Sequence, residues 1–332
     1  MAGAEYLKNL IKAHINGDHN KFRQIALQIA AKEASLGHGK VAKEIRELID
    51  NVSPMLGQHT GNVPPELKIS AKSNISDLLH SSYPKERLYD IVLLPKTESS
   101  IHRIIDEWRN RNNLESHGLH CKSKLLLIGP PGCGKTLSAR VLAGELGLPL
   151  FVVKLEGLIS RYLGETAVHL RNIFNAITNT NGIYLFDEFD SIGTNRGDQR
   201  DVGEIRRVLS TFLILLEGFI GNSIIIAATN HEHMLDKALF RRFDDVIEFP
   251  MPSEKSAEKL ILNKLQCVEK ENLNWNALAK ETKGMSYAEI SKAITESLKT
   301  SVLNKYKKIK QNVIIESILR RKEMNSSNKN KE

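Results

Sequence analysis

The sequence contains, at residues 124–136, the stretch KLLLIGPPGCGKT, which carries more information about the fold than any other segment. It begins with a short apolar run, KLLLI, and continues into GPPGCGKT, which fits the pattern GxxxxGK[ST]. Residues 137–146 then follow with helical periodicity. A buried strand, a glycine-rich loop and a helix in this order are typical of a loop that binds the phosphates of a nucleotide. A glycine-rich turn that merely contains a lysine is the weaker interpretation, because it does not explain that order.

The residue types of this loop suit phosphate binding. Glycine lets the backbone turn sharply and point N–H groups at phosphate oxygens, and the N-terminus of the following helix adds favourable partial charge. Lys135 supplies a cation for the β- and γ-phosphates, and the Thr136 hydroxyl is a ligand for Mg²⁺. We also expect the helix N-terminus to lower the pKa of the Cys133 thiol. The residues that we expect to bind the nucleotide here are Gly129, Pro130, Pro131, Gly132, Cys133, Gly134, Lys135, Thr136 and Leu137.

Two other apolar runs end in polar residues that extend this site. Residues 183–188 read IYLFDE, so Asp187 can hold Mg²⁺ and Glu188 can polarise the water that attacks the γ-phosphate. We expect Asp190, shortly after them, to cap a helix rather than to bind the metal. Residues 224–230 read IIIAATN, and the Asn230 carboxamide suits a hydrogen bond to the γ-phosphate or the water. These residues alone leave open that Asn230 only caps the end of its strand.

From about residue 86, short apolar runs alternate with helical stretches. Such runs are typical of buried parallel strands, since helices cover both faces of the sheet. The fold class is therefore α/β: a three-layer domain with a parallel sheet at 86–250, then a helical lid at 251–323 and a basic tail at 324–332. The predicted strands are 124–128, 148–153, 183–186, 223–228 and 246–249.

The region before residue 86 has a different character. Three amphipathic stripes between residues 4 and 52 predict a small helical bundle at 1–52 that holds no evident catalytic group. Residues 53–85 begin with a segment rich in Pro, Gly, Ser and Asn, which predicts a linker. A bundle joined by a linker suits the recruitment of a substrate or partner.

The composition narrows the class of protein. The chain has 332 residues and a formal charge of +8, and 41% of its residues are hydrophobic, which argues against a disordered or fibrous chain. Residues 251–332 carry 17 lysines and arginines against 10 acidic residues. They form either a solvated basic face, which we favour, or a surface for nucleic acid, an acidic protein tail or a membrane. The three cysteines form no CxxC pair, and no apolar run is long enough to span a bilayer. We expect a cytoplasmic protein with no membrane partner.

The motifs GPPGCGKT, LFDEFD, IIIAATN and ALFRRFDDVIEF, in this order, resemble those of an AAA-type ATPase of the AAA+ superfamily. The resemblance covers residues 86–322. It implies that the chain binds ATP and Mg²⁺ at the subunit boundaries of a homo-oligomeric ring, usually a hexamer. It further implies that Asn230 corresponds to the residue called sensor 1.

The resemblance also implies roles for residues outside those strands. Arg241 and Arg242 correspond to arginine fingers, and Arg242 aligns best although the two are adjacent here rather than separated. Gly284 and Ala288, in the sequence GMSYAEI, correspond to the start of the lid helix that covers the nucleotide. That segment lacks the arginine called sensor 2, which places the chain nearer the protein-remodelling clade.

Two loops resemble the pore loops of that clade. Residues 160–165 read SRYLGE, so Tyr162 and Leu163 correspond to the pair that grips an extended polypeptide, in preference to a buried core tyrosine. Residues 193–203 form either a second pore loop or a surface loop.

The N-terminal section is similar to that of bacterial AAA proteins encoded beside a subtilisin-like serine protease, in pairs of the toxin–antitoxin or phage-defence type. The leading hypothesis is a ring ATPase that uses Mg-ATP to remodel or thread a protein substrate, together with such a protease in antiviral defence. The alternatives are a nucleotide-gated binding partner of the protease that threads nothing, and a nucleic-acid-stimulated ATPase.

Overall fold

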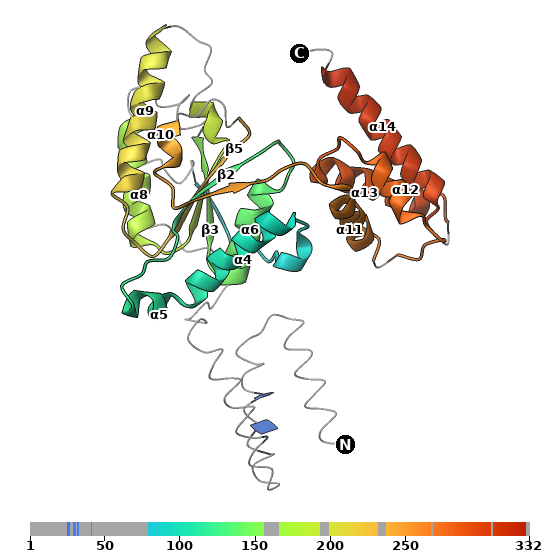
Figure 1. Cartoon of the computed structure of the whole chain (residues 1–332), viewed down its shortest axis with the longest axis horizontal. Coiled ribbons are helices and arrows are strands. Elements are labelled where there is room, and N and C mark those ends of the chain that lie inside the picture. The colour runs from blue at the N-terminus through green and yellow to red at the C-terminus, as the bar shows by residue number, and fades with distance from the viewer. Residues whose placement is uncertain are drawn as a thin grey trace. The chain divides into compact units, whose positions relative to one another are not determined.

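A computed structural model describes residues 25–26, 29–30, 32, 41, 79–155, 166–192, 199–231, 237–266, 268–306 and 308–329 of the chain (Figure 1). The chain divides into two compact units, Met1–Val63 and Pro64–Glu332. In the first unit the few described residues are helical, in keeping with the stripes of residues 4–52. The rest of the predicted bundle and most of the predicted linker lie outside the described residues.

The second unit alternates strands and helices and then becomes entirely helical (Figure 1). Its described elements are β1 (Leu79–Ser82), η2 (Leu88–Asp90), α4 (Pro95–Arg109), α5 (Arg111–Ser116), β2 (Lys124–Ile128), α6 (Lys135–Leu146), β3 (Leu150–Lys154), α8 (Thr166–Asn179), β4 (Ile183–Asp187), η3 (Phe189–Ile192), α9 (Gln199–Glu217), β5 (Ile224–Thr229), α10 (Lys237–Phe240), β6 (Asp245–Glu248), α11 (Glu254–Lys264), α12 (Trp275–Glu281), α13 (Tyr287–Leu303) and α14 (Gln311–Lys329).

The strands form one sheet in the order β1-β3-β4-β5-β2-β6. All its pairings are parallel except that of β1 with β3, which is antiparallel. The α/β class and the predicted strands are confirmed, with shifts of one or two residues at their ends. The sequence did not predict β1, which lies within the stretch 53–85 assigned to the linker. Its four residues, LHSS, contain no apolar run that would mark a strand. β1 lies at the edge of the sheet, where a strand pairs with only one neighbour.

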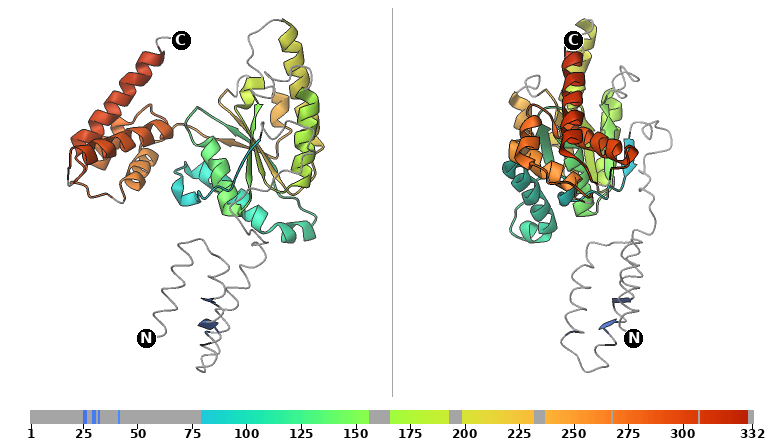
Figure 2. Two further views of the ribbon diagram at one scale, coloured as in Figure 1. Left: turned by 180° about the vertical axis from the view of Figure 1, so that it is seen from behind. Right: turned by 90° about the vertical axis from the view of Figure 1, so that its right-hand side faces the viewer.

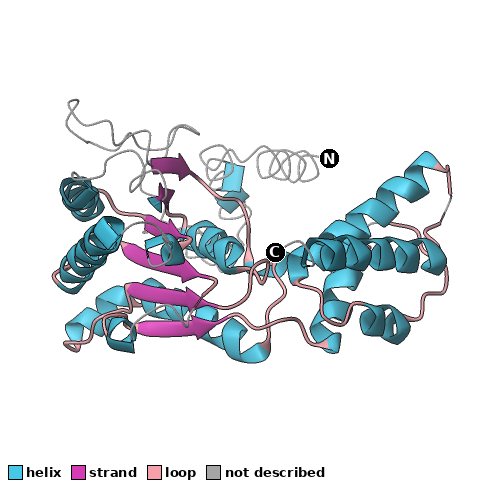
Figure 3. Cartoon of the chain, turned by 90° about the horizontal axis from the view of Figure 1, so that it is seen from above, coloured by secondary structure: helices cyan, strands magenta, loops and turns pink. Residues whose placement is uncertain are grey.

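Both faces of the sheet are covered, as Figures 2 and 3 show. Alternate residues of β2 belong to opposite cores, because successive side chains of a strand point to opposite faces. Leu125 and Leu127 pack with α4 and α6, whereas Leu126 packs with α8 and α9. The second core is rich in aromatic rings, with Phe212 of α9 in edge-on contact with Phe186 of β4 at 5.0 Å between ring centroids. Full burial on both faces explains why these strands read as unbroken apolar runs.

The C-terminal helices α11 to α14 continue the first core, with Ile290 and Ile294 of α13 fully buried. A capping box between Ser286 and Glu289 begins α13. The Ala288 N–H, in the first turn of this helix, donates to the Gly132 carbonyl at 3.0 Å. The glycine-rich loop is therefore in direct contact with the start of a lid helix.

In the described part of the chain, no helix is both long and apolar enough to cross a bilayer. The cytoplasmic location and the domain boundaries given above remain predictions.

The close contact between α6 and the segment before η2 leads to a prediction about the stability of the folded protein. Gly144 lies within α6, where replacement of glycine by alanine normally stabilises by about 1 kcal/mol. A Cβ at this position would lie only 2.1 Å from the Glu86 carbonyl oxygen. We expect Gly144→Ala to destabilise the protein by about 1–3 kcal/mol, because the backbone must move apart. Urea unfolding followed by circular dichroism measures the change, and a gain in stability would contradict the contact.

Candidate active site

Parallel pairing brings the ends of three strands to one edge of the sheet. β5 pairs with β2 so that Thr229 lies opposite Ile128, and with β4 so that Ala227 lies opposite Phe186. The glycine-rich loop follows β2, Asp187 ends β4, and Asn230 follows β5. The three motifs therefore converge, as the sequence predicts, at the carboxyl ends of their strands.

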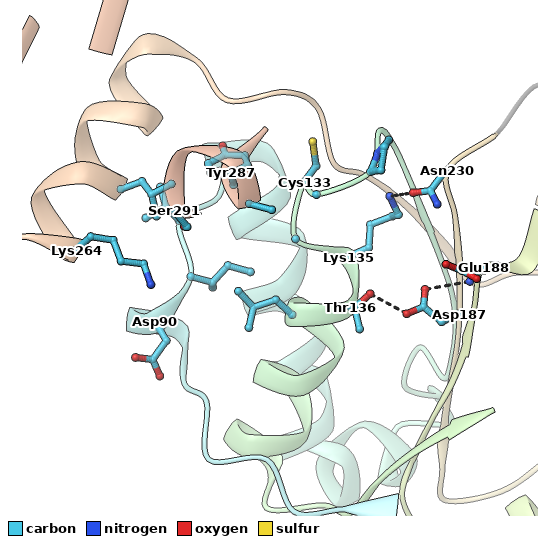
Figure 4. Close-up of a pocket in the computed structure, with 18 residues that line it drawn as sticks. Asp90, Cys133, Lys135, Thr136, Asp187, Glu188, Asn230, Lys264, Tyr287 and Ser291 are labelled. Carbon is cyan, nitrogen blue, oxygen red and sulfur yellow. Dashed lines mark hydrogen bonds between the residues drawn. The ribbon is translucent and has the colours of Figure 1, made fainter. Parts of the chain in front are cut away.

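The Lys135 ammonium lies at the centre of this convergence (Figure 4). Its side chain is buried, and Nζ donates to the carbonyls of Gly129 at 2.6 Å and Pro130 at 2.9 Å and to Asn230 Oδ1 at 2.8 Å. Burial lowers the pKa of Lys135, while the negative charges of Asp187 and Asp190 act in the opposite direction. Two carbonyls of the loop and one side chain that follows β5 therefore hold the ammonium in place.

A second contact joins the loop to β4. The Thr136 hydroxyl donates to Asp187 Oδ2 at 2.8 Å, and Asp187 Oδ1 accepts from the Glu188 N–H at 3.0 Å. Thr136 belongs to the first turn of α6, where backbone N–H groups and the helix dipole favour an anion. A hydroxyl and a carboxylate in contact are hard oxygen donors of the kind that Mg²⁺ prefers, so the two residues fit the predicted metal role.

Glu188 has a backbone φ of 51°, in the left-handed region that non-glycine residues seldom adopt. Such conformations cost about 1–3 kcal/mol and are concentrated at functional sites. The turn directs the chain sharply out of β4, and Glu188 lines the same cavity as Lys135 and Thr136.

The cavity has a volume of about 410 Å³ and extends from the glycine-rich loop to the lid (Figure 4). Of the predicted site residues, Pro131 to Leu137, Asp187, Glu188, Asn230 and Ala288 line it, whereas Gly129, Pro130 and Gly284 do not. The far end is lined by residues that the sequence analysis did not predict. Tyr287 lies within the GMSYAEI segment, whereas no motif marks the others, Asp90, Ile91, Val92, Leu260, Lys264 and Ser291. They come from the end of η2 and the residues after it, and from α11 and α13, which only the tertiary fold brings together.

Two expectations about single residues are wrong. The Cys133 thiol is 1% exposed and lies 3.7 Å from the Met251 sulfur, and burial raises its pKa, so the helix N-terminus does not make it reactive. Among the described residues, the Asp190 carboxylate caps no helix N-terminus. It accepts hydrogen bonds from the end of β5 instead.

Arg241 and Arg242 do not line the cavity. Arg242 forms an ion pair with Glu217 at the end of α9, while Arg241 is exposed. Asp244 accepts from the Ser123 and Lys124 N–H groups, which places this segment at the beginning of β2. The glycine-rich loop follows the opposite end of that strand, roughly 15 Å away at about 3.3 Å per residue. Tyr162 and Leu163 lie outside the described residues.

Comparisons with known proteins agree with this architecture. Residues 125–251 match the family described as "ATPase family associated with various cellular activities (AAA)". A Sinorhizobium fredii protein named as an AAA family ATPase is 34% identical over 314 residues, which cover 94% of this chain and 93% of the relative. The chain therefore belongs to the AAA family of ATPases, and it is an ATP-binding enzyme that hydrolyses ATP.

Other relatives are matched over a smaller share of their own length. ATP-dependent zinc metalloprotease FtsH 3 of Sphaerobacter thermophilus is 32% identical over 222 residues, 64% of this chain and 45% of the relative. The 26S proteasome regulatory subunit 6A of Saccharomyces cerevisiae is 31% identical over 244 residues, 71% of this chain and 56% of the relative. This chain thus spans about half the length of each of these two proteins.

Proposed function

We propose that this AAA ATPase assembles into a homo-oligomeric ring, hydrolyses Mg-ATP at its subunit boundaries and uses the energy to remodel a protein substrate. The observation that carries the ATPase chemistry is the convergence of Lys135, Thr136, Asp187, Glu188 and Asn230 on one cavity. The protein substrate is supported by relatives named as an ATP-dependent protease and as a proteasome regulatory subunit.

Each polar residue of the cavity has a proposed role. The Lys135 ammonium and the N–H groups at the start of α6 bind the phosphates, and a bound Mg²⁺ would neutralise phosphate charge while held by Thr136 and Asp187. Glu188 orients the attacking water, and Asn230 positions the γ-phosphate or that water. Because phosphoryl transfer needs charge stabilisation and positioning, these groups suffice without a covalent intermediate.

The position of the arginines supports a ring. Among the described cavity-lining residues, the cations are Lys135 and Lys264, and no arginine contributes. Arg241 and Arg242 lie at the other end of β2, so within one chain they are too far away to contact the γ-phosphate. We propose that Arg242, rather than Arg241, enters the cavity of a neighbouring copy, which makes hydrolysis depend on assembly.

The residues that bind the substrate and the identity of the partner are proposed from the sequence alone. Tyr162 and Leu163 are the proposed pore residues that grip the polypeptide, and residues 1–52 are the proposed recruitment domain. The subtilisin-like protease partner and the role in antiviral defence are proposed from the N-terminal resemblance.

The roles of Lys135 and Glu188 predict opposite phenotypes. Lys135→Ala should abolish ATP binding, since the phosphates lose their cation. Glu188→Gln should bind ATP with unchanged affinity but hydrolyse it at least about 100-fold more slowly, since only the water is misplaced. Titration with a fluorescent ATP analogue and a phosphate-release assay separate the two effects. Full turnover by Glu188→Gln would disprove its role.

The proposed action of Arg242 in a neighbouring copy is tested by mixing variants. Arg242→Ala should retain ATP affinity but lose hydrolysis, because the missing charge belongs to the adjacent site. Mixed with Lys135→Ala, it should regain part of the turnover at boundaries where an intact site meets an intact arginine. Arg241→Ala is the matched control. If it is the more damaging variant, the assignment to Arg242 is wrong.

Threading is tested at the proposed pore. Tyr162→Ala should retain ATPase activity yet lose the unfolding of a protein substrate, since the grip on the polypeptide is removed. The readout is loss of fluorescence from a stably folded reporter fused to the captured partner. Unfolding that equals the wild type would favour a gating function. ATPase stimulation by DNA that is lost on neutralising Lys305, Lys307, Lys308 and Lys310 would instead favour a nucleic-acid function.

A further inference from the structure

Asp190 is a buried carboxylate to which the proposed mechanism gives no role. It lies in η3, directly beyond the turn that carries Glu188, and the residue is only 8% exposed. A buried carboxylate is costly unless hydrogen bonds satisfy it. Its contacts therefore show what the fold uses it for.

The hydrogen bonds of Asp190 go to the end of the neighbouring strand. Oδ1 accepts from the Thr229 hydroxyl at 3.1 Å and from the Asn230 N–H at 3.2 Å. Oδ2 lies 3.9 Å from Nε2 of His231. The Thr229 oxygen in turn accepts from the His231 N–H at 3.1 Å. One carboxylate thus fixes three consecutive residues at the point where β5 ends.

This anchor determines where the Asn230 side chain lies. The Asn230 backbone is held by Asp190, and its Oδ1 accepts from the Lys135 ammonium at 2.8 Å. Because Oδ1 is used in this way, the two amide hydrogens of Asn230 point elsewhere and can donate to an anion. The hydrogen bonds therefore run in series from Asp190 through Asn230 to Lys135.

The hydrogen bond between Asp190 and Asn230 also connects the segments that follow β4 and β5. Asp190 follows β4 and Asn230 follows β5, so the hydrogen bond holds the turn containing Glu188 against the residue proposed as sensor 1. β4 and β5 pair only as far as Phe186 and Ala227, two or three residues before these turns. Beyond that point, the sheet no longer fixes the relative placement of Glu188 and Asn230.

We propose that Asp190 is a positioning residue for ATP hydrolysis, which holds Asn230 in register with Glu188 and Lys135. The inference rests on the proposed roles of Asn230 and Glu188. Misplacement of a positioned group by about 1 Å lowers the rate up to about 100-fold. Loss of Asp190 should therefore lower kcat much more than it weakens ATP binding.

The test compares Asp190→Ala with Asp190→Asn, measuring ATP Kd, kcat and thermal unfolding. Asp190→Ala should lower kcat about 10- to 100-fold while the Kd changes less than about threefold, since the phosphate-binding loop remains. Asp190→Asn should recover part of that loss, because its carboxamide oxygen still accepts from Asn230. If Asp190→Ala fails to fold, a comparison of Thr229→Val with Thr229→Ser tests the same contact from the side of Thr229, whose hydroxyl donates to Asp190.

A matched control exists at the opposite end of the same strand. Ser223, directly before β5, is fully buried; its hydroxyl donates to the Ile177 carbonyl and accepts from the Gly182 N–H. Ser223→Ala should reduce stability and leave kcat within about twofold, as expected of a purely structural buried hydrogen bond. Equal kcat in Asp190→Ala and Ser223→Ala variants of equal thermal stability would overturn the inference.

A double variant separates this inference from the proposed function. If Asp190 acts through Asn230, Asp190→Ala combined with Asn230→Ala should be no slower than Asn230→Ala alone. Multiplied effects would overturn the link between the two residues. Full kcat in Asn230→Ala would instead disprove the proposed role of Asn230. A slow Asn230→Ala beside a normal Asp190→Ala would overturn only the positioning role.

Discussion

Parallel pairing of β5 between β2 and β4 is the constraint on which the rest of the structure depends. Side by side in the same direction, three strands deliver their C-terminal residues to one edge, where a glycine-rich loop, a carboxylate pair and an asparagine meet. An antiparallel β5 would place Asn230 at the opposite edge and leave the Lys135 ammonium without its side-chain acceptor. Burial on both faces stabilises this arrangement, with Leu127 fully enclosed in the first core and Leu126 and Phe186 in the second.

The electrostatics of the site follow from that convergence. A buried ammonium is unfavourable, and burial accordingly lowers the pKa of Lys135. Three oxygen acceptors and the nearby charges of Asp187 and Asp190 compensate. The site therefore holds its cation in place before it contacts phosphate, and preorganised charge of this kind lowers the barrier to reaction because little reorganisation is needed.

The site is also connected to parts of the chain far from the sheet edge. The Gly132 carbonyl accepts from the Ala288 N–H of the lid, and a Cβ on Gly132 would lie 2.7 Å from the Ser286 hydroxyl. Any shift of the phosphate-binding loop must therefore also displace the start of α13. Arg241 and Arg242, by contrast, do not line the cavity of their own chain. The glycine-rich loop thus links the cavity directly to the first turn of α13.

The sequence by itself determined the class, five of the strands and most of the cavity's polar residues, because apolar runs and the loop motif depend on local chemistry alone. It misjudged Cys133 and Asp190, whose environments come from Met251 and from the end of β5. Only the tertiary structure revealed the edge strand β1 and the far wall of the cavity around Lys264. These depend on which distant segments pack together, and a linear pattern records the burial of a residue but not the identity of its neighbours.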